Sequence, residues 1–294
     1  MTDDLLSTAI VAAQAGAAVI SRYFRHAGLD VRAKAENDFV TQADKESEAA
    51  VVEVIRARFP EHRILAEEGG GAGVGSGEYE WLIDPLDGTT NFVQGLPVYA
   101  VSIACRKGGE LLVAVIHDPE GKNLFTATRG GGAFWNGRPM FATGTTGGAR
   151  RDGLKGAFLA TGYPFRALST LDLYLAIFRD VFHYAKAIRR CGSAALDLAY
   201  TAAGVYDGFF EFRLSPWDIG AGILLVREAG GVVTDLDGGE DFFASGNIVA
   251  GGPGVHRDLL AAVRRHASEE AVERVNPFRS LVAGARGAVR SAST

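Results

Sequence analysis

The spacing of apolar residues divides the chain into a helical start, a strand-rich middle and a mixed second half. Leu6 and Ile10 begin a run of apolar residues at three- and four-residue steps, which predicts an amphipathic helix over residues 3–26. Similar spacing predicts a helix over 44–59, and the short apolar run at 63–66 predicts a buried strand. Other short, β-rich runs predict extended segments at 29–34, 79–83, 98–106, 111–118 and 123–128, with a turn at 38–41.

Strands and helices alternate in the second half of the chain. The pattern predicts strands at 156–160, 185–188 and 208–212, and helices at 171–179, 193–204 and 219–229. This mixed order favours an α+β fold built in layers over a regular βαβ array. The segment 143–153 is typical of a connector. We therefore expect one domain over residues 1–267, with halves 1–142 and 154–267, followed by a partly disordered tail at 268–294.

The composition is that of a globular protein of 294 residues, with 47% hydrophobic and 22% charged residues. The balance of 30 basic and 35 acidic side chains gives a net charge of −5, so neither a nucleic acid nor a membrane is an expected partner. Two cysteines make no disulfide framework, which favours a cytoplasmic location. The acidic start and the lack of a long apolar run predict neither a signal peptide nor a membrane span.

Glycine is abundant, with 38 residues against an average share of about 7%. Six of these glycines fall within residues 69–77. This run contains neither GxGxxG nor GK[ST], so it meets no nucleotide-binding fingerprint. It is typical of a mobile loop, and its position just after Glu67 leaves a lid as the alternative.

Acidic residues follow apolar stretches at several sharp turns. Glu67 and Glu68 end the strand predicted at 63–66, Asp84 and Asp87 lie in WLIDPLDGTTNF, and Asp218 lies in SPWDIGAG. Each residue alone has an ordinary interpretation as a turn residue, a helix cap or a surface charge. If they converge, their like charges repel, and a divalent cation with a preference for hard oxygen ligands such as Mg²⁺ is the natural partner.

Glycine turns in the same segments precede predicted helix starts. Pro85 fixes one backbone angle, and Gly88 allows a tight turn before Thr89. The segment CGSAAL at 191–196 has a similar glycine turn, and a third helix is expected to start near Asp218. Helix N-termini offer free N–H groups to anions, so metals and N–H donors together predict a phosphate site.

Several of these segments, taken in order, resemble the inositol monophosphatase family, the magnesium-dependent, lithium-sensitive phosphatases. DPLDGTTNF (84–92) fits the first signature of that family, and WDIGAGILLVREAGG (217–231) fits the second. KAENDFVTQAD (34–44) and the Glu67–Glu68 pair stand in the expected order, and RRCGSAALDLAYTAAGVYDGFFE (189–211) is similar to its substrate-facing region. The resemblance covers about residues 3–266. It implies the layered α-β-α-β-α sandwich of the inositol monophosphatase and fructose-1,6-bisphosphatase type.

The resemblance implies two to three Mg²⁺ ions per active site. The first would be held by Glu67, Asp84 and the carbonyl of Leu86, and the second by Asp84, Asp87 and Asp218. Glu67 and waters would hold a weaker third. The resemblance also implies that the attacking water is positioned and partly deprotonated by Thr89, which Asp44 would orient, with Glu67 assisting. All of these residue types are present.

The resemblance further implies the residues that contact the substrate. Gly88 and Thr89 would present N–H groups to the phosphate, bordered by Asp87 and Asp218. The organic part would lie against a glycine turn and a strand end, at Gly192, Ser193, Ala194 and Glu211. Glu211 would accept hydrogen bonds from hydroxyl groups of the substrate.

The implied activity is hydrolysis of inositol 1-phosphate or a similar polyol phosphate by metal-activated water, which is a phosphoric monoester hydrolase reaction. Lithium inhibition and a homodimer are implied as well. Histidinol phosphate is the nearest alternative substrate, and sugar bisphosphates and 3′-phosphoadenosine 5′-phosphate are less favoured. A non-catalytic interaction module on the same fold is an alternative of another class. Such a module would be marked by the loss of a site residue, and none is lost at Glu67, Asp84, Asp87, Thr89 or Asp218.

Overall fold

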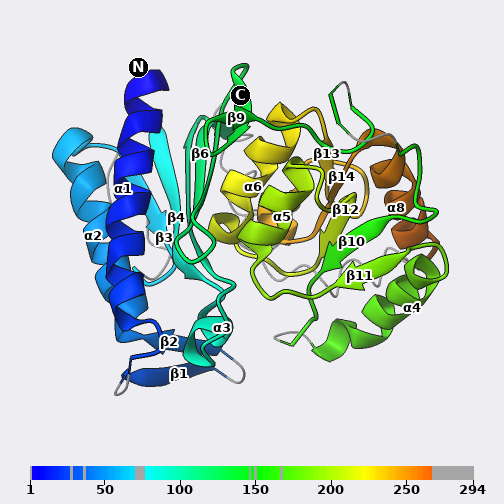
Figure 1. The fold of residues 1–294 in the computed structure, drawn as a ribbon, viewed down its shortest axis with the longest axis horizontal. Coiled ribbons are helices and arrows are strands. Elements are labelled where there is room, and N and C mark those ends of the chain that lie inside the picture. Colours follow the sequence, from blue (N-terminus) through cyan, green and yellow to red (C-terminus); the bar gives the residue numbers. More distant parts are fainter. Residues whose placement is uncertain are drawn as a thin grey trace, which may run out of the picture.

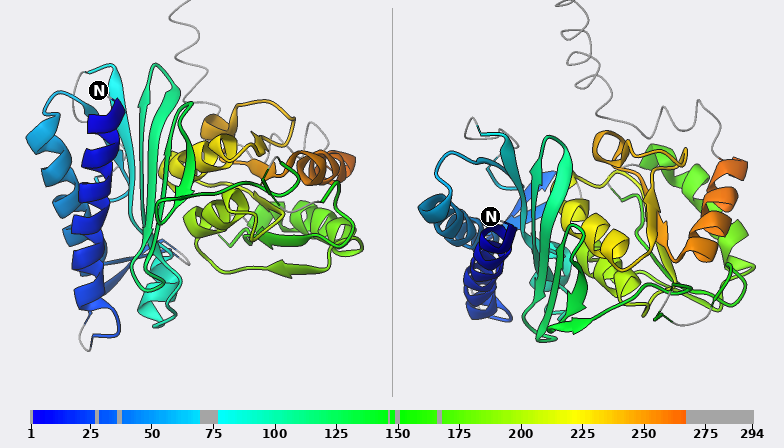
Figure 2. Two further views of the ribbon diagram at one scale, coloured as in Figure 1. Left: turned by 45° about the horizontal axis from the view of Figure 1, so that its top comes forward. Right: turned by 90° about the horizontal axis from the view of Figure 1, so that it is seen from above.

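Helices and two main sheets alternate in five layers (Figure 1). The computed structural model describes residues 2–26, 29–35, 38–69, 77–145, 147–148, 151–165 and 168–266. Helices α1 (Thr2–Tyr23) and α2 (Gln42–Arg58) form the first layer, next to a seven-stranded sheet. The central layer holds α5 (Ala194–Ala202) and α6 (Pro216–Glu228). A five-stranded sheet follows, and α4 (Leu171–Phe182) and α8 (Pro253–His266) cover it (Figure 2). The layered α+β fold is thereby confirmed.

The seven-stranded sheet is mostly antiparallel, and its strands follow each other in chain order. Only β3 and β4 are parallel to each other, with Ala66 paired to Ile83. This parallel pair brings the carboxyl ends of both strands to the same edge of the sheet. The strands are β3 (Arg63–Ala66), β4 (Tyr79–Asp87), β5 (Ala100–Lys107), β6 (Glu110–Asp118), β7 (Asn123–Thr128), β8 (Gly132–Trp135) and β9 (Arg138–Pro139).

The five-stranded sheet is mixed, in the order β11-β10-β12-β14-β13. Strands β11, β10 and β12 are parallel, and β14 and β13 continue antiparallel. Their bounds are β10 (Phe158–Thr161), β11 (Ala187–Arg189), β12 (Gly208–Glu211), β13 (Val232–Thr234) and β14 (Ile248–Gly251). The small elements are the β1 (Val31–Ala35) and β2 (Asp38–Thr41) pair, α3 (Thr89–Val93), the 3₁₀ turn Leu168–Thr170 and α7 (Phe242–Ser245). The division into halves 1–142 and 154–267 stays a proposal, in which each half contributes one main sheet.

Small residues let the first layer pack closely. A Cβ atom at Gly16 of α1 would stand 2.8 Å from Ser47 Oγ and 2.8 Å from Val51 Cγ2 of α2. The apolar side of α1, including Leu5 and Ile20, is buried against the sheet. By length and composition alone α1 could cross a membrane, but half of its most apolar window is buried in the protein. Packing on the sheet therefore accounts for the apolarity of α1.

The sequence pattern located most elements within a few residues, with two kinds of difference. The turn expected at 38–41 is wrong, because these residues form β2 and pair antiparallel with β1. No element was expected within 132–139 or 232–266. Strands of two to four residues are too short to show a periodicity, whereas the four-residue spacing of Val255 and Leu259 in α8 was a readable signal. Residues 70–76 of the glycine-rich run and the tail at 268–294 lie outside the described residues.

Candidate active site

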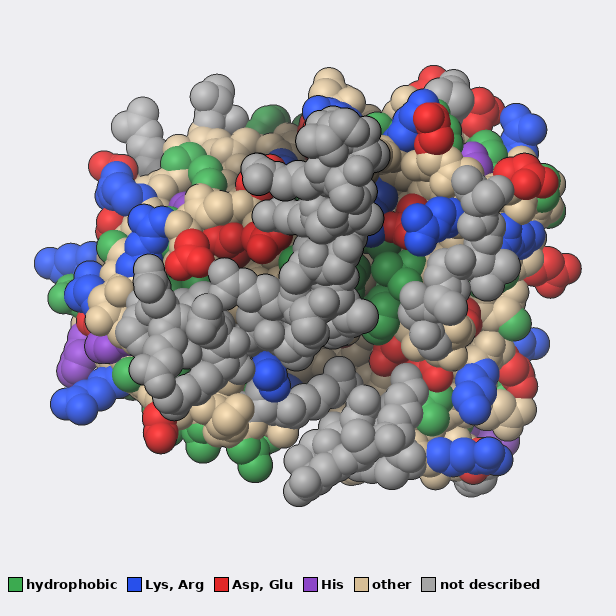
Figure 3. Space-filling model, turned by 180° about the vertical axis from the view of Figure 1, so that it is seen from behind, with side chains coloured by type: hydrophobic (Ala, Val, Ile, Leu, Met, Phe, Trp, Pro, Cys, Tyr) green, Lys and Arg blue, Asp and Glu red, His purple; other side chains and the backbone are tan. Residues whose placement is uncertain are grey.

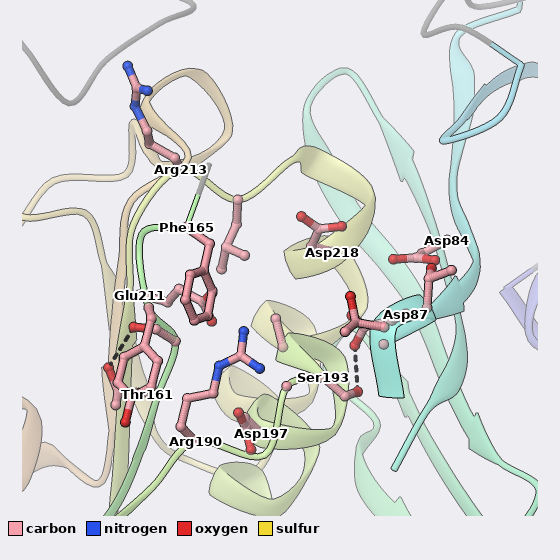
Figure 4. Close-up of a pocket in the computed structure, with 18 of the residues that line it drawn as sticks. Asp84, Asp87, Thr161, Phe165, Arg190, Ser193, Asp197, Glu211, Arg213 and Asp218 are labelled. Atoms are coloured by element: carbon pink, nitrogen blue, oxygen red, sulfur yellow. Dashed lines mark hydrogen bonds between the residues drawn. The ribbon is translucent and has the colours of Figure 1, made fainter. Parts of the chain in front are cut away.

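The predicted site residues surround one cavity of about 310 Å³ between the two main sheets. In Figure 4 the carboxylates of Asp84, Asp87 and Asp218 lie on one side of it, and Thr161, Phe165 and Glu211 lie on the other. The sequence-predicted residues along its wall are Glu67, Asp84, Leu86, Asp87, Gly88, Thr89, Gly192, Ser193, Ala194, Glu211 and Asp218. Of the residues expected to act in the site, Asp44 alone does not line this cavity.

The acidic side of the cavity is assembled by the parallel strand pair and a helix start. Glu67 follows β3, and its N–H donates to the Ile83 carbonyl of β4 at 3.2 Å, so it is held next to Asp84. Asp218 lies in the first turn of α6, where its Oδ2 accepts from the Ser215 N–H at 2.7 Å. The expected helix start near Asp218 is therefore confirmed, although Ser215 and not Asp218 is the N-cap.

Asp87 joins β4 to the start of α5 across the cavity. Its Oδ2 accepts from Ser193 Oγ at 2.6 Å and from the Ala195 N–H at 2.8 Å. Asn91 of α3 makes a second link, because its Nδ2 donates to the carbonyl oxygens of Val98 and Cys191, each at 2.8 Å. These bonds fix the first main sheet against the glycine turn that precedes α5.

The backbone at position 88 requires glycine. Its φ of +94° lies in the left-handed region, and an added Cβ would stand 2.8 Å from the Val98 carbonyl oxygen. A larger residue would push the start of α3 away from the cavity wall. The sequence-based expectation of a tight turn at Gly88 is confirmed.

Asp44 lies behind Thr89 and is fully buried. Its Oδ2 accepts from the N–H and Oγ1 of Thr41, at 2.8 and 2.6 Å, which makes it the N3 residue of a capping box on α2. Its Oδ1 is 3.1 Å from Thr89 Oγ1, which is also 3.1 Å from the Leu86 carbonyl oxygen. A hydroxyl group has one proton, so Thr89 donates to one of these acceptors at a time. Asp44 thus contacts Thr89, which lines the cavity, without lining the cavity itself.

The clustered carboxylates disfavour ionisation of one another. Burial raises the pKa of Asp84 well above its usual value, and the charges of Glu67, Asp87 and Asp218 raise it further. Burial also raises the pKa of Asp87 to about 6, against the opposing hydrogen bonds from Ser193 and Ala195. For Asp44, burial raises the pKa to about 6, with Glu68 and Glu67 adding to the effect.

These oxygen donors fit a hard divalent cation, which would relieve their mutual repulsion. No three His, Cys, Asp or Glu side chains among the described residues already stand as a ligand set. A bound cation would therefore have to draw the carboxylates together. Glu67, Asp84, Asp87 and Asp218 are the residues that would hold it, with the Leu86 carbonyl as a further oxygen donor.

The raised pKa values predict how pH and magnesium act together on stability. Folded, metal-free protein holds protons on Asp44 and Asp87 up to about pH 6, whereas the unfolded chain releases them near pH 3.8. Since the folded state binds more protons in this window, the stability contributed by these two groups is present below about pH 4 and is lost as pH rises through about 6. Magnesium competes with protons for ionised carboxylates. We expect the gain in Tm when EDTA is replaced by Mg²⁺ to increase from about pH 5 to about pH 7. Scanning calorimetry checks this, and an equal gain at both pH values would contradict it.

Sequence reasoning predicted Glu211 at the other end of the cavity but missed several residues that line this end with it. Tyr163 and Phe165 follow β10, and the Arg190 guanidinium lies over their rings, 5.6 and 5.2 Å from the centroids. Glu211 packs directly on Gly162, where a Cβ would overlap its carboxylate. Arg190 adjoins the glycine turn at 191–196, which was a usable signal. Asp197 also lines the cavity, and nothing in its spacing distinguished it from a solvent-facing helix residue.

Comparisons with known proteins agree with the fold and with the family signatures. The sequence profile of the "Inositol monophosphatase family" matches residues 1–269. The chain is 47% identical to Nus factor SuhB of Escherichia coli (strain K12) over 266 residues, covering 90% of this chain and 97% of that protein. The extragenic suppressor protein suhB from Bartonella henselae is 40% identical with a TM-score of 0.83, covering 89% of this chain and 98% of that one. The inositol monophosphatase from Anabaena (Nostoc) sp. PCC 7120 is 39% identical with a TM-score of 0.79, covering 92% and 98%.

Proposed function

Because the chain belongs to the inositol monophosphatase family, we propose that it is a magnesium-dependent phosphomonoesterase that hydrolyses inositol 1-phosphate or a similar polyol phosphate. The observation that carries this proposal is the gathering of Glu67, Asp84, Asp87 and Asp218 on one side of a single cavity. Such a cluster is unfavourable without a cation, and a cation-lined cavity suits a phosphate ester.

Each part of the cavity has a role in the proposed reaction. Two or three Mg²⁺ ions on the four carboxylates would polarise the ester phosphate and lower the pKa of a water molecule. The N–H groups of Gly88 and Thr89 would hold the phosphate oxygens. The Thr89 hydroxyl, kept in place by Asp44, would orient the attacking water, with Glu67 assisting. Positioning and charge stabilisation supply most of the rate in such a reaction.

The organic part of the substrate would lie between the start of α5 and the end of β12. Gly192, Ser193 and Ala194 would line it on one side, and Glu211 would accept hydrogen bonds from its hydroxyl groups on the other. The cavity contains both acidic groups and the Arg190 cation at this end. That mixture favours a hydroxyl-rich leaving group over a purely apolar one.

The test is phosphate release from a panel of esters with Mg²⁺, with EDTA and with Li⁺. We expect inositol 1-phosphate to be turned over with a higher kcat/KM than histidinol phosphate or sugar phosphates. EDTA should abolish turnover, excess Mg²⁺ should restore it, and millimolar Li⁺ should inhibit it. A higher kcat/KM for histidinol phosphate would replace the proposed substrate, and turnover that persists in EDTA would refute the magnesium mechanism.

A second candidate function is an interaction role that is separate from catalysis. The relative from Escherichia coli is named a Nus factor and the Bartonella structure an extragenic suppressor protein, and neither name describes phosphoester hydrolysis. The two roles can be separated in the organism that carries the chain. An Asp84→Asn protein without turnover that still replaces the wild type would establish the second role.

The remaining expectations concern partners and location. On the face drawn in Figure 3, described Lys and Arg side chains are scattered among Asp and Glu side chains and form no continuous basic stripe there. That no nucleic acid binds the protein stays an expectation, based on its net charge of −5. The family supports a homodimer in the cytoplasm, and both remain proposals.

A further inference from the structure

One buried carboxyl group in the cavity wall has no use in the proposed reaction. Asp197 of α5 is only 2% exposed, and its Oδ1 is buried with no hydrogen-bond partner among the described residues. Buried polar atoms are nearly always paired, because leaving one unpaired is costly. A group that stays unpaired next to a binding cavity is therefore a candidate for contact with the ligand.

The helix geometry places this carboxyl in the substrate cavity. Ser193 is the N-cap of α5, and Asp197 follows it by four residues, so both side chains lie on the same face of the helix. Both residues line the cavity. Figure 4 shows Asp197 below Arg190, away from Asp84 and Asp218. Asp197 thus borders the part of the cavity where the organic part of the ester would lie in the proposed reaction.

The neighbours of Asp197 determine what it can recognise. Burial raises its pKa well above the usual value, Glu211 and Asp87 raise it further, and Arg190 opposes them. The described residues show no ion pair between Asp197 and Arg190, whose guanidinium lies against the rings of Tyr163 and Phe165. An uncharged carboxyl group offers one O–H donor and one carbonyl acceptor.

We propose that Asp197 is a specificity-determining residue that hydrogen-bonds a hydroxyl group on the leaving-group side of the substrate. This inference rests on the proposed phosphomonoesterase function and deepens it to a polyol ester whose hydroxyl reaches the start of α5. A hydroxyl group both donates and accepts, so it satisfies both atoms of the carboxyl group. An ammonium group only donates, and an apolar group leaves the carboxyl unpaired.

The test compares two variants on two esters. Asp197→Leu removes both hydrogen-bonding atoms, whereas Asp197→Asn keeps an acceptor oxygen and supplies N–H donors in nearly the same shape. The esters are inositol 1-phosphate and phenyl phosphate, which has no hydroxyl group. We expect Asp197→Leu to raise KM for inositol 1-phosphate about tenfold and to leave kcat/KM for phenyl phosphate unchanged. Asp197→Asn should keep KM for inositol 1-phosphate within about threefold of the wild type. The control is Asp172→Asn, because Asp172 is an exposed residue in the first turn of α4. This variant should leave KM and kcat/KM unchanged for both esters.

Other outcomes overturn the inference in distinguishable ways. An equal loss of kcat/KM for both esters in Asp197→Leu would make Asp197 a structural residue. An unchanged kcat/KM for both esters would mean that Asp197 does not touch the substrate. A rise in KM for inositol 1-phosphate in Asp197→Asn as large as in Asp197→Leu would show that the negative charge of Asp197 is needed, which contradicts recognition by an uncharged carboxyl group. If the wild type turns over neither ester in Mg²⁺, the proposed function fails, and this inference fails with it.

Discussion

Replacing Asp84 with Asn is expected to lower kcat about 10³-fold and to remove the response of stability to magnesium. Asp84 is buried in β4, and burial together with the charges of three other acidic side chains raises its pKa well above the usual value. The amide keeps the shape but loses the charge that would hold Mg²⁺. In EDTA the variant should melt at a higher temperature than the wild type, because a source of repulsion has been removed. In Mg²⁺ it should gain no further Tm.

Phosphate release and scanning calorimetry with and without Mg²⁺ measure these effects. Asp118→Asn is the matched control, since Asp118 is also a buried residue at a strand end of the same sheet. Asp118 accepts hydrogen bonds from the Gly121 N–H and the Asn123 amide and does not line the cavity. The Asp118→Asn substitution should lower Tm and leave the gain in Tm on adding Mg²⁺ unchanged. An Asp84→Asn protein that keeps kcat within tenfold of the wild type would exclude Asp84 as a magnesium ligand.

Removing the hydroxyl group of Thr89 is expected to lower kcat about 10²- to 10³-fold with little change in KM. Thr89→Val keeps the β-branched shape but loses the atom that stands 3.1 Å from Asp44 Oδ1. If this hydroxyl orients the attacking water, the loss falls on the chemical step and not on substrate binding. Steady-state kinetics on inositol 1-phosphate at saturating Mg²⁺ separates kcat from KM.

Thr89→Ser is the matched variant, because it restores the hydroxyl and removes only a methyl group. We expect it to keep kcat within about tenfold of the wild type. Equal losses of kcat in Thr89→Val and Thr89→Ser would attribute the effect to packing at the start of α3. A large rise in KM in Thr89→Val alone would assign Thr89 to binding of the phosphate.

The acidic side of the site could be predicted from the sequence because its residues lie in short contiguous segments, in which neighbouring residues indicate the local structure. Asp84 and Asp87 stand around Pro85 and before Gly88, so strand end, turn and helix start follow from the residues themselves. The parallel pairing of β3 with β4 then brings Glu67 to them. The pairing itself depends on tertiary structure and could not be predicted locally. The apolar run before Glu67, however, already indicated a buried strand.

The opposite end of the cavity could not be predicted from the residues alone. Arg190 and Asp197 belong to a segment that was singled out, yet their side chains reach the cavity only because α5 packs between the two sheets. Tyr163 and Phe165 follow β10, where no motif marked them. Asp44 shows the converse case, since its capping-box position was readable from Thr41, but its contact with Thr89 crosses 45 positions of the chain. Contacts of this kind depend on packing and leave no local periodicity.

The two walls of the cavity are built from different segments of the chain, and this has an evolutionary consequence. Asp84 and Asp87 are mounted on β4, whereas Glu211, Arg190 and Asp197 are carried by β12 and by the segments around α5. Substitutions on the second wall can therefore change which molecule is accepted while the cation-holding wall keeps its sequence. Proteins with this arrangement can acquire new substrates through substitutions at a few positions of the second wall, while the residues that would hold the cation stay the same.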